Sequence, residues 1–234
     1  MTILTVVQNV CAQLALEVPT AVFSSVDTDI IQIRTLANVE VSEITRKHDW
    51  QILRRQREFT LVATETQTGI FPSDYFRMVN GTFQNRTLNR PVWGPLTPQA
   101  WQQQKALPIY TSPNYAYVER GGEILFSPTP SGGDDVYFEY ITKYSVVDSG
   151  GTAKEYFTAD SDTWRLDEKM LELALIWRFK AAKGFDYTQE ADTYNSNVAS
   201  QIAQEQPAPL LAMDGRSPRY LLGSPTIPEG SWST

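Results

Sequence analysis

The sequence predicts an α+β protein: an antiparallel four-helix bundle with a β-rich insertion and an extended C-terminal tail. Three observations predict this class. Apolar residues recur every three to four positions near both ends, alternate with polar residues in the middle, and lose their periodicity after Pro207. We therefore divide the chain into a helical bundle from 1–58 and 150–206, an insertion from 59–149 and a tail from 207–234.

Four segments have the apolar spacing of an amphipathic helix. The first lies within 2–17, and the second begins near Ser25 or Asp27, either of which can cap its first turn. The third begins near Leu166 and ends at Gly184, and it is apolar around most of its surface, so we expect it to be buried on several sides. The fourth spans roughly 187–206. The apolar stripe of the second helix is Ile30, Ile33, Ala37, Val41 and Ile44.

Short β-prone runs fill the insertion. A strand is expected from about Phe59, another within 134–144, and Asn80-Gly81 indicates a hairpin turn. The clearest hairpin turns at Gly121-Gly122, where a two-residue turn aligns one ionic and two apolar pairs across the strands. Those pairs are Arg120 with Glu123, Val118 with Leu125 and Tyr117 with Phe126.

Composition limits the classes of function. The 234 residues carry a formal net charge of −7, which argues against a surface that binds polyanions in general. No apolar run approaches the ~20 residues that span a bilayer, so we expect no membrane partner. The single cysteine, Cys11, and the single histidine, His48, exclude a thiolate-rich zinc site and a site built from several imidazoles.

An enzyme remains an alternative interpretation. Glycosidase chemistry needs only two carboxylates at a suitable separation, although acidic side chains in such a composition are usually solvated surface groups. A serine hydrolase would have to use His48, which lies at the polar end of a helix, and Cys11 lies on an apolar stripe typical of a core residue. The candidate carboxylates are Asp134, Asp135, Glu139, Asp160 and Asp162.

One charge cluster stands out. Residues 46–58 hold five of the chain's 20 basic residues against only Asp49 and Glu58. The cluster is either a solvated helix end that favours cations near its C-terminus, or a basic patch that meets an acidic partner or a nucleic-acid backbone. Its members are Arg46, Lys47, Arg54, Arg55 and Arg57.

Several motifs in this order resemble a known family. A helical pair is followed by Phe71-Pro72-Ser73-Asp74, then by the tyrosine-rich stretch 113–130, then by 137–144, and a second helical pair follows. The stretch 113–130 contains the hairpin and ends in Leu125-Phe126-Ser127-Pro128 and a second proline. This pattern resembles the head-to-tail adaptor, or connector, proteins of tailed bacteriophages, especially the short-tailed ones, across most of 1–206.

The resemblance implies a structural protein of the virion, made in the host cytoplasm and placed at the head–tail interface. Such adaptors form a twelve-subunit ring beneath the portal protein, extend the channel for genomic DNA with weak contacts, and dock tail nozzle or tail fibre proteins. The resemblance implies no cofactor and no catalytic residue. Some phage tail parts degrade peptidoglycan, so a tail-associated hydrolase with a carboxylate pair is the alternative.

Aromatic residues of the insertion are candidates for docking tail proteins, because aromatic side chains often anchor interfaces. They serve equally well in the core of a domain. These residues are Trp93, Tyr110, Tyr115 and Tyr117.

The tail from 207–234 has no periodic apolar pattern from which to build a core of its own, yet it carries large apolar side chains. We expect it to be disordered in the monomer and to become ordered on the portal or on a neighbouring subunit. The alternative is a tail that folds back on its own bundle. Its candidate anchors are Leu210, Leu211, Tyr220, Leu221, Leu222 and Trp232.

Overall fold

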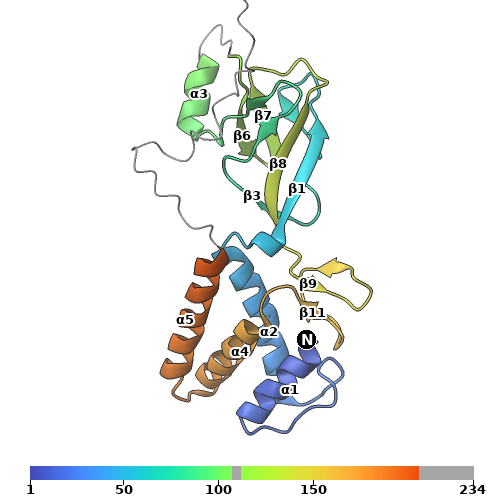
Figure 1. Ribbon diagram of the computed structural model, residues 1–234, viewed down its shortest axis with the longest axis vertical. Helices are drawn as coiled ribbons and strands as arrows, with labels where there is room; N and C mark the ends of the chain where they lie inside the picture. The colour runs from blue at the N-terminus through green and yellow to red at the C-terminus, as the bar shows by residue number, and fades with distance from the viewer. Residues whose placement is uncertain (107–111, 206–234) are drawn as a thin grey trace, which may run out of the picture.

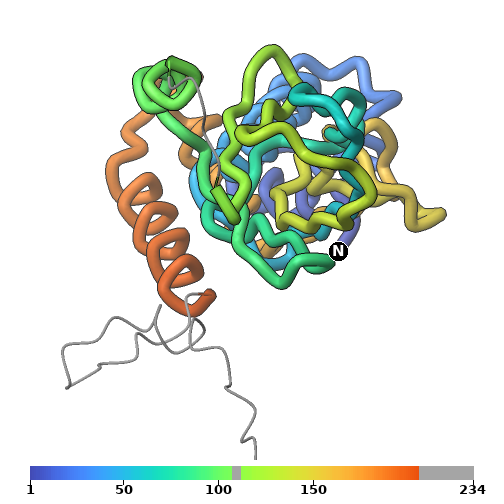
Figure 2. The backbone as a smooth tube through the Cα atoms, turned by 90° about the horizontal axis from the view of Figure 1, so that it is seen from above, coloured from blue at the N-terminus to red at the C-terminus, as the bar shows by residue number. Residues whose placement is uncertain are grey.

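Two separate hydrophobic cores, one among helices and one between sheets, organise the molecule (Figure 1). The computed structural model describes residues 1–106 and 112–205. Four of the five described helices gather at one end of the long axis, and the larger sheets lie at the other. Viewed along that axis, α5 lies on one flank and the loop that contains β9 and β10 projects from the opposite flank (Figure 2).

Four helices surround the first core: α1 (Ile3–Gln13), α2 (Thr28–Lys47), α4 (Glu168–Lys183) and α5 (Thr188–Glu205). The expected caps are confirmed. The Asp27 carboxylate accepts a hydrogen bond from the Asp29 amide at the start of α2, and Gly184 ends α4 in the left-handed conformation at φ 77°. The predicted stripe of α2 is buried along its whole length.

The predicted four-helix bundle with an insertion is wrong. The described residues form five helices and three antiparallel sheets, and the fifth helix, α3 (Pro98–Ala106), lies at the β-rich end. The helix α4 is buried on several sides, as its sequence predicts, and it contacts α1, α2 and α5. A small sheet completes the same core with Val146 and Trp164, so helices alone do not enclose it. That sheet consists of β9 (Val146–Val147), β10 (Ala153–Lys154) and β11 (Thr163–Trp164).

Two further sheets enclose the second core. In the larger sheet, the long strand β8 (Asp135–Thr142) pairs with β1 (Arg54–Thr60) on one edge. On its other edge β8 pairs with β3 (Tyr75–Met78) and β4 (Gln84–Asn85), and β5 (Arg90–Pro91) pairs with β4. The smaller sheet has the order β2 (Thr66–Gln67), β7 (Glu123–Ser127), β6 (Ala116–Arg120).

Aromatic rings fill the space between these sheets. Phe83 lies 4.9 Å from Tyr117, 5.7 Å from Phe126 and 5.4 Å from Phe138, measured between ring centroids. The hairpin of β6 and β7 has the predicted register, with Arg120 opposite Glu123, Val118 opposite Leu125 and Tyr117 opposite Phe126.

Two local predictions in the insertion are wrong. The first strand begins at Arg54 rather than near Phe59, because an edge strand tolerates exposed charged side chains that hide its alternation. Asn80-Gly81 does not close a hairpin. It joins β3 to β4, and both strands pair antiparallel with successive parts of β8.

A fully buried carboxylate links three helices. Glu40 of α2 accepts hydrogen bonds from the Arg178 guanidinium of α4, with Nε at 2.8 Å, and from the Tyr194 hydroxyl of α5. Arg178 also donates to the exposed Glu43 at 2.6 Å. Burial and the charge of Glu40 raise the pKa of Tyr194, so its hydroxyl keeps its proton and donates it to Glu40.

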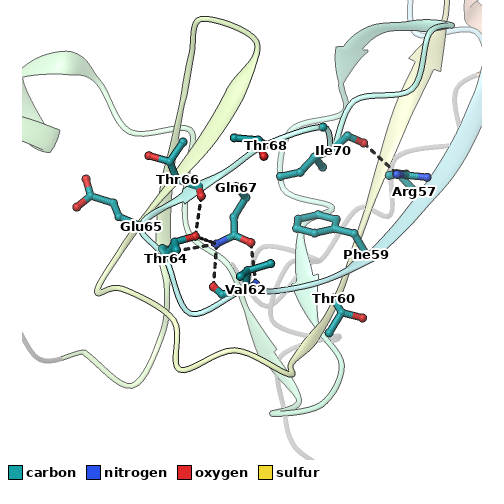
Figure 3. Close-up of a pocket in the computed structure, with 11 residues that line it drawn as sticks. Arg57, Phe59, Thr60, Val62, Thr64, Glu65, Thr66, Gln67, Thr68 and Ile70 are labelled. Atoms are coloured by element: carbon teal, nitrogen blue, oxygen red, sulfur yellow. Dashed lines mark hydrogen bonds between the residues drawn. The ribbon is translucent and has the colours of Figure 1, made fainter.

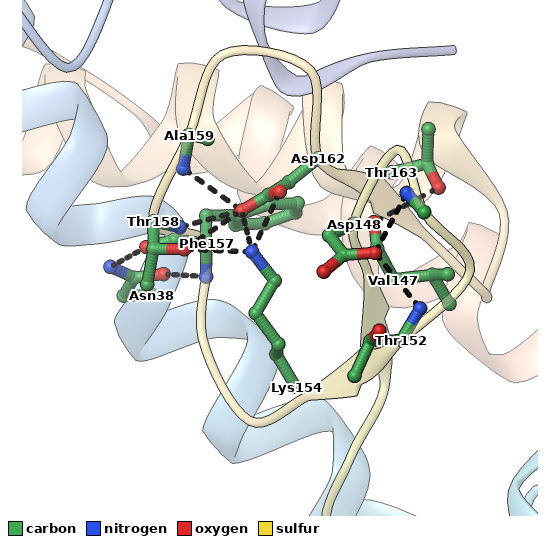
Figure 4. Close-up of polar contacts among 11 residues, drawn as sticks. Asn38, Val147, Asp148, Thr152, Lys154, Phe157, Thr158, Ala159, Asp162 and Thr163 are labelled. Atoms are coloured by element: carbon green, nitrogen blue, oxygen red, sulfur yellow. Dashed lines mark hydrogen bonds and ion pairs between the residues drawn. The ribbon is translucent and has the colours of Figure 1, made fainter.

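A second buried carboxylate fixes the long connection between β8 and α4 (Figure 4). The Asp162 carboxylate accepts from Lys154 Nζ at 2.9 Å and from the amides of Thr158 at 2.7 Å and Ala159 at 2.9 Å. Burial alone raises the pKa of Asp162, but these hydrogen bonds outweigh burial and lower the pKa below its ordinary value of 3.8. The same connection meets α2 where Asn38 accepts a hydrogen bond from the Phe157 amide at 2.9 Å.

We expect Glu40→Gln to lower the free energy of unfolding by about 3–5 kcal/mol, because it leaves Arg178 without its buried counter-ion. Glu43→Gln is the matched control, since its side chain binds the same guanidinium but is 59% exposed, and it should cost less than about 1 kcal/mol. Chemical denaturation measures both. Equal losses for the two variants would contradict the role assigned to Glu40.

We expect Asp162→Asn to cost about 1–3 kcal/mol, because the amide of asparagine cannot accept all the hydrogen bonds that the carboxylate receives. The folded-state pKa of Asp162 is lowered, so its stabilisation is complete above the unfolded-state pKa and is lost as the pH falls through the folded-state pKa. Thermal melts should therefore separate the two proteins at pH 7 and bring them together below about pH 3. A constant difference across this range would contradict the ionised, buried Asp162.

Candidate interaction surface

The five residues of the basic patch lie on two elements that meet where the helical end joins the β-rich end. Arg46 and Lys47 lie in the last turn of α2, and the other three lie on β1. Because side chains alternate along a strand, β1 divides its three arginines between the two faces of the sheet. Arg54 lies on the outer face, 3.6 Å from Glu139, whereas Arg55 and Arg57 lie on the inner face.

The two helical members contact aromatic rings of neighbouring elements. The Arg46 guanidinium lies 5.9 Å from the centre of the Phe76 ring, and Lys47 Nζ lies 5.5 Å from that of Tyr194. Arg77 of β3 donates to the Arg46 carbonyl at 3.2 Å and pairs with Asp49 at 2.7 Å. The Arg46 and Arg77 contacts join the end of α2 to β3, whereas the Lys47 contact joins α2 to α5. Arg46 and Lys47 remain exposed.

The inner face of β1 borders an open hollow of about 640 Å³ (Figure 3). Arg57 and Phe59 form one wall, and the segment from Val62 to Ile70 forms the other. Arg57 donates to the Ile70 carbonyl at 2.9 Å. The buried Gln67 shapes the far wall, because its amide accepts from the Val62 amide at 2.8 Å and donates to the Val62 carbonyl at 2.9 Å.

The candidate docking aromatics occupy different environments. Tyr117 is buried in the second core, and Tyr115 packs against that core and donates to Asp134 at 3.2 Å. Trp93 is 59% exposed, and its backbone is tied to Tyr115 and Tyr117 by hydrogen bonds of 2.8 Å. Gly94 allows this close approach, since a Cβ there would lie 2.6 Å from the Tyr117 ring. Tyr110 lies outside the described residues.

The candidate anchors of the C-terminal tail also lie outside the described residues. They are Leu210, Leu211, Tyr220, Leu221, Leu222 and Trp232. The described chain ends at Glu205, whose carboxylate accepts a hydrogen bond from the Gln51 amide at 3.0 Å, three residues before β1 begins.

The candidate carboxylates of a hydrolase each hold the fold together. Asp160 accepts from the amides of Val22 and Phe23 at 2.9 Å, and Asp162 is buried as described above. The lowered pKa of Asp162 keeps it ionised, whereas a general acid needs a raised pKa.

The other three candidates belong to the larger sheet and its borders. Asp134 accepts from Asn85 at 3.0 Å, Asp135 accepts from Thr60 at 2.7 Å, and Glu139 pairs with Arg54. Each of these three carboxylates therefore takes part in a structural hydrogen bond or ion pair.

The lone cysteine and the lone histidine also have structural surroundings. Cys11 is buried in the helical core, and burial, helped by the charges of Asp27 and Asp29, raises the pKa of its thiol to about 11. His48 packs edge-on against Trp50, and its Nε2 lies 3.9 Å from a Glu205 oxygen. Within 1–106 and 112–205, no group of histidine, cysteine and acidic residues is arranged to hold a metal ion. The described helices include none with the length and apolar character needed to cross a membrane.

Sequence reasoning missed two parts of this surface. The hollow depends on how the 62–70 segment packs beside β1, which no local motif records. Arg165 is the other missed residue. It lies near Arg55, and both burial and the charge of Arg55 lower the pKa of its guanidinium. Arg165 is a single basic residue between β11 and the Asp167 cap of α4, and the sequence there gives no signal that would have identified it.

Comparison with known proteins identifies the family. A family model described as SU10 adaptor protein matches residues 1–220, which include both cores, the basic patch and the hollow beside β1. A search of the curated proteins found no match. The family model covers nearly the whole chain, and the resemblance to phage adaptors noted in the motifs is thereby confirmed. The chain therefore belongs to the SU10 adaptor protein family, a family of phage head–tail adaptors.

Proposed function

We propose that the protein is a head-to-tail adaptor that forms a ring of twelve copies between the portal and the tail. The match to the adaptor family over 1–220 carries this proposal, because it spans both the helical and the β-rich ends. In the proposed ring the chain extends the DNA channel, meets the portal on one side and docks tail nozzle or fibre proteins on the other.

The two ends of the molecule suit two different roles in such a ring. The helices pack through buried side chains at one end, and the β-rich end carries the exposed Trp93. The basic patch lies where the two ends meet. We assign tail-protein docking to the β-rich end, with Trp93 as its aromatic anchor. We assign the basic patch to a boundary with another protein, since an adaptor that lets DNA slide needs weak contacts in its channel. The net charge of −7 per chain favours an acidic lumen.

The C-terminal tail is assigned to the portal or to a neighbouring subunit. Its 28 residues can reach up to ~90 Å when fully extended, at ~3.3 Å per residue. The described chain ends at Glu205, beside Gln51 and between the two cores. A tail that starts at this point can extend toward either end of the molecule.

Truncation after Gln206 tests the role of the tail. The shortened protein should keep the melting temperature of the full chain, because both described cores lie before this point. It should fail to join portal particles in an assembly assay read by native mass and electron microscopy. Joining at full affinity would contradict the docking role, and loss of folding would show instead that the tail belongs to the helical core.

Trp93→Ala tests the docking surface at the β-rich end. Tail-protein attachment should weaken about tenfold or more, since large exposed aromatic anchors often contribute ~2 kcal/mol or more to an interface. Leu88→Ala is the matched control, because Leu88 is also an exposed apolar residue of this end, at 41%. Equal effects of the two substitutions on attachment of purified tail proteins to adaptor-loaded particles would remove Trp93 from the interface.

A further inference from the structure

The strand β1 forms an open edge of the larger sheet. Its seven residues contain no proline and show no irregularity against β8. The opposite edge is protected in the usual way, since β5 has only two residues and one of them is Pro91. The charged side chains of β1 deter pairing with an arbitrary strand, but its backbone groups remain available to a strand of complementary charge.

The hydrogen bonds around β8 show which groups of β1 face outward. Leu61 directs its amide to the Asp134 carbonyl at 2.8 Å, on the β8 side. The backbone N–H and C=O groups alternate in direction along a strand. Those of Arg55, Arg57 and Phe59 therefore also point toward β8, and those of the residues between them point away from it. The outward amides belong to Gln56, Glu58 and Thr60, and none of them donates to another residue in the described part of the chain.

The side chains beside this edge are cationic and apolar. Arg55, Arg57 and Phe59 follow one another along the inner face, where Phe59 and Arg57 form a wall of the hollow. Neither Arg55 nor Arg57 forms an ion pair with a described residue. Arg165 adds a third guanidinium near Arg55, and its buried Nε has no hydrogen-bond partner among the described residues.

We propose that the free edge of β1 accepts an extended acidic segment of a partner protein, which adds to the larger sheet as an antiparallel strand. Side chains directly opposite each other in such a pair attract when their charges differ. The added strand therefore carries, from its N-terminus, an apolar residue opposite Phe59, then a carboxylate opposite Arg57, then a carboxylate opposite Arg55, each separated by one residue. The proposal specifies the chemistry of the partner that the basic patch binds. It rests on the proposed function only because that function treats the patch as an interface.

Other occupants fit this edge less well. A second copy of β1 centred on the same residue would place Arg57 opposite Arg57. The residues beyond Glu205 contain only two acids, Asp214 and Glu229, which are too far apart to match the alternating pattern. Duplex DNA offers phosphates to the arginines, but it has no row of donors and acceptors to pair with a strand edge.

A synthetic peptide with alternating valine, threonine and glutamate in this pattern is the probe, and the full chain is the receptor. Fluorescence anisotropy should show binding by this peptide and at least tenfold weaker binding by a control peptide with lysine in place of glutamate. Arg57→Glu should weaken binding at least tenfold, whereas Arg54→Glu on the outer face of the same strand should change it less than threefold.

Gln56→Pro tests the backbone contribution. It removes an outward amide and leaves the groups that face β8 intact, so the protein should fold but bind the peptide at least tenfold more weakly. Gln56→Thr is the matched control and should bind as the wild type does. Should the proline variant fail to fold, hydrogen exchange of the wild type decides: the peptide should protect the amides of Gln56, Glu58 and Thr60.

Three results would overturn the proposal: equal binding of the glutamate and lysine peptides, unchanged exchange at those three amides, or an Arg57-dependent affinity for duplex DNA without affinity for the peptide. The experiment uses the isolated chain and no portal. A failure of ring assembly would therefore leave its outcome unchanged, and a failure of peptide binding would leave the adaptor role untouched.

Discussion

The arrangement of the helical end depends on one charged group that water does not reach. The buried Glu40 side chain accepts hydrogen bonds from Arg178 and Tyr194, which belong to two other helices. These hydrogen bonds fix the rotation of α2, α4 and α5 about their axes, since each must direct a particular side chain to the same point. An apolar residue at position 40 would pack with far less directional preference.

The position of α5 in turn affects the junction with the β-rich end. With its first half held by Tyr194, the helix runs to Glu205, which meets the Gln51 amide just before β1. From there β1 pairs with β8 along its whole length. The strand β8 belongs to both ends, because Ile141 lies in the helical core while Tyr140 lies in the core between the sheets. Glu40 and the free edge of β1 are thus linked by a continuous series of packed elements and not by a flexible linker.

Features set by neighbouring residues could be predicted from the sequence, and features set by distant partners could not. The Asp27 cap, the Gly184 terminus and the pairing across Gly121-Gly122 each follow from short-range chemistry. The apolar character of α4 indicated burial on several sides but carried no information on which elements cover it. The sequence therefore favoured a bundle, whereas the structure places a small sheet with Val146 and Trp164 against the helices.

For the candidate surface too, the sequence predicted local features but not those that depend on distant residues. Counting charges located the basic patch at residues 46–58, but only the register of β1 against β8 shows that Arg54 lies on one face and Arg55 and Arg57 on the other. Exposure could not be read from residue type either. Trp93 and Tyr117 are both large aromatic residues of the insertion, yet one is at the surface and the other is in the core.

The order of the two cores along the chain has a consequence for synthesis. The core between the sheets uses residues from Phe59 to Tyr140, a continuous stretch, whereas the helical core joins α1 and α2 to α4 and α5 across that stretch. On a ribosome the β-rich end is complete before α4 emerges. Until then the apolar faces of α1 and α2 remain exposed to solvent without α4, their main packing partner. The synthesis of the last quarter of the chain therefore sets how long the nascent protein exposes an aggregation-prone apolar surface.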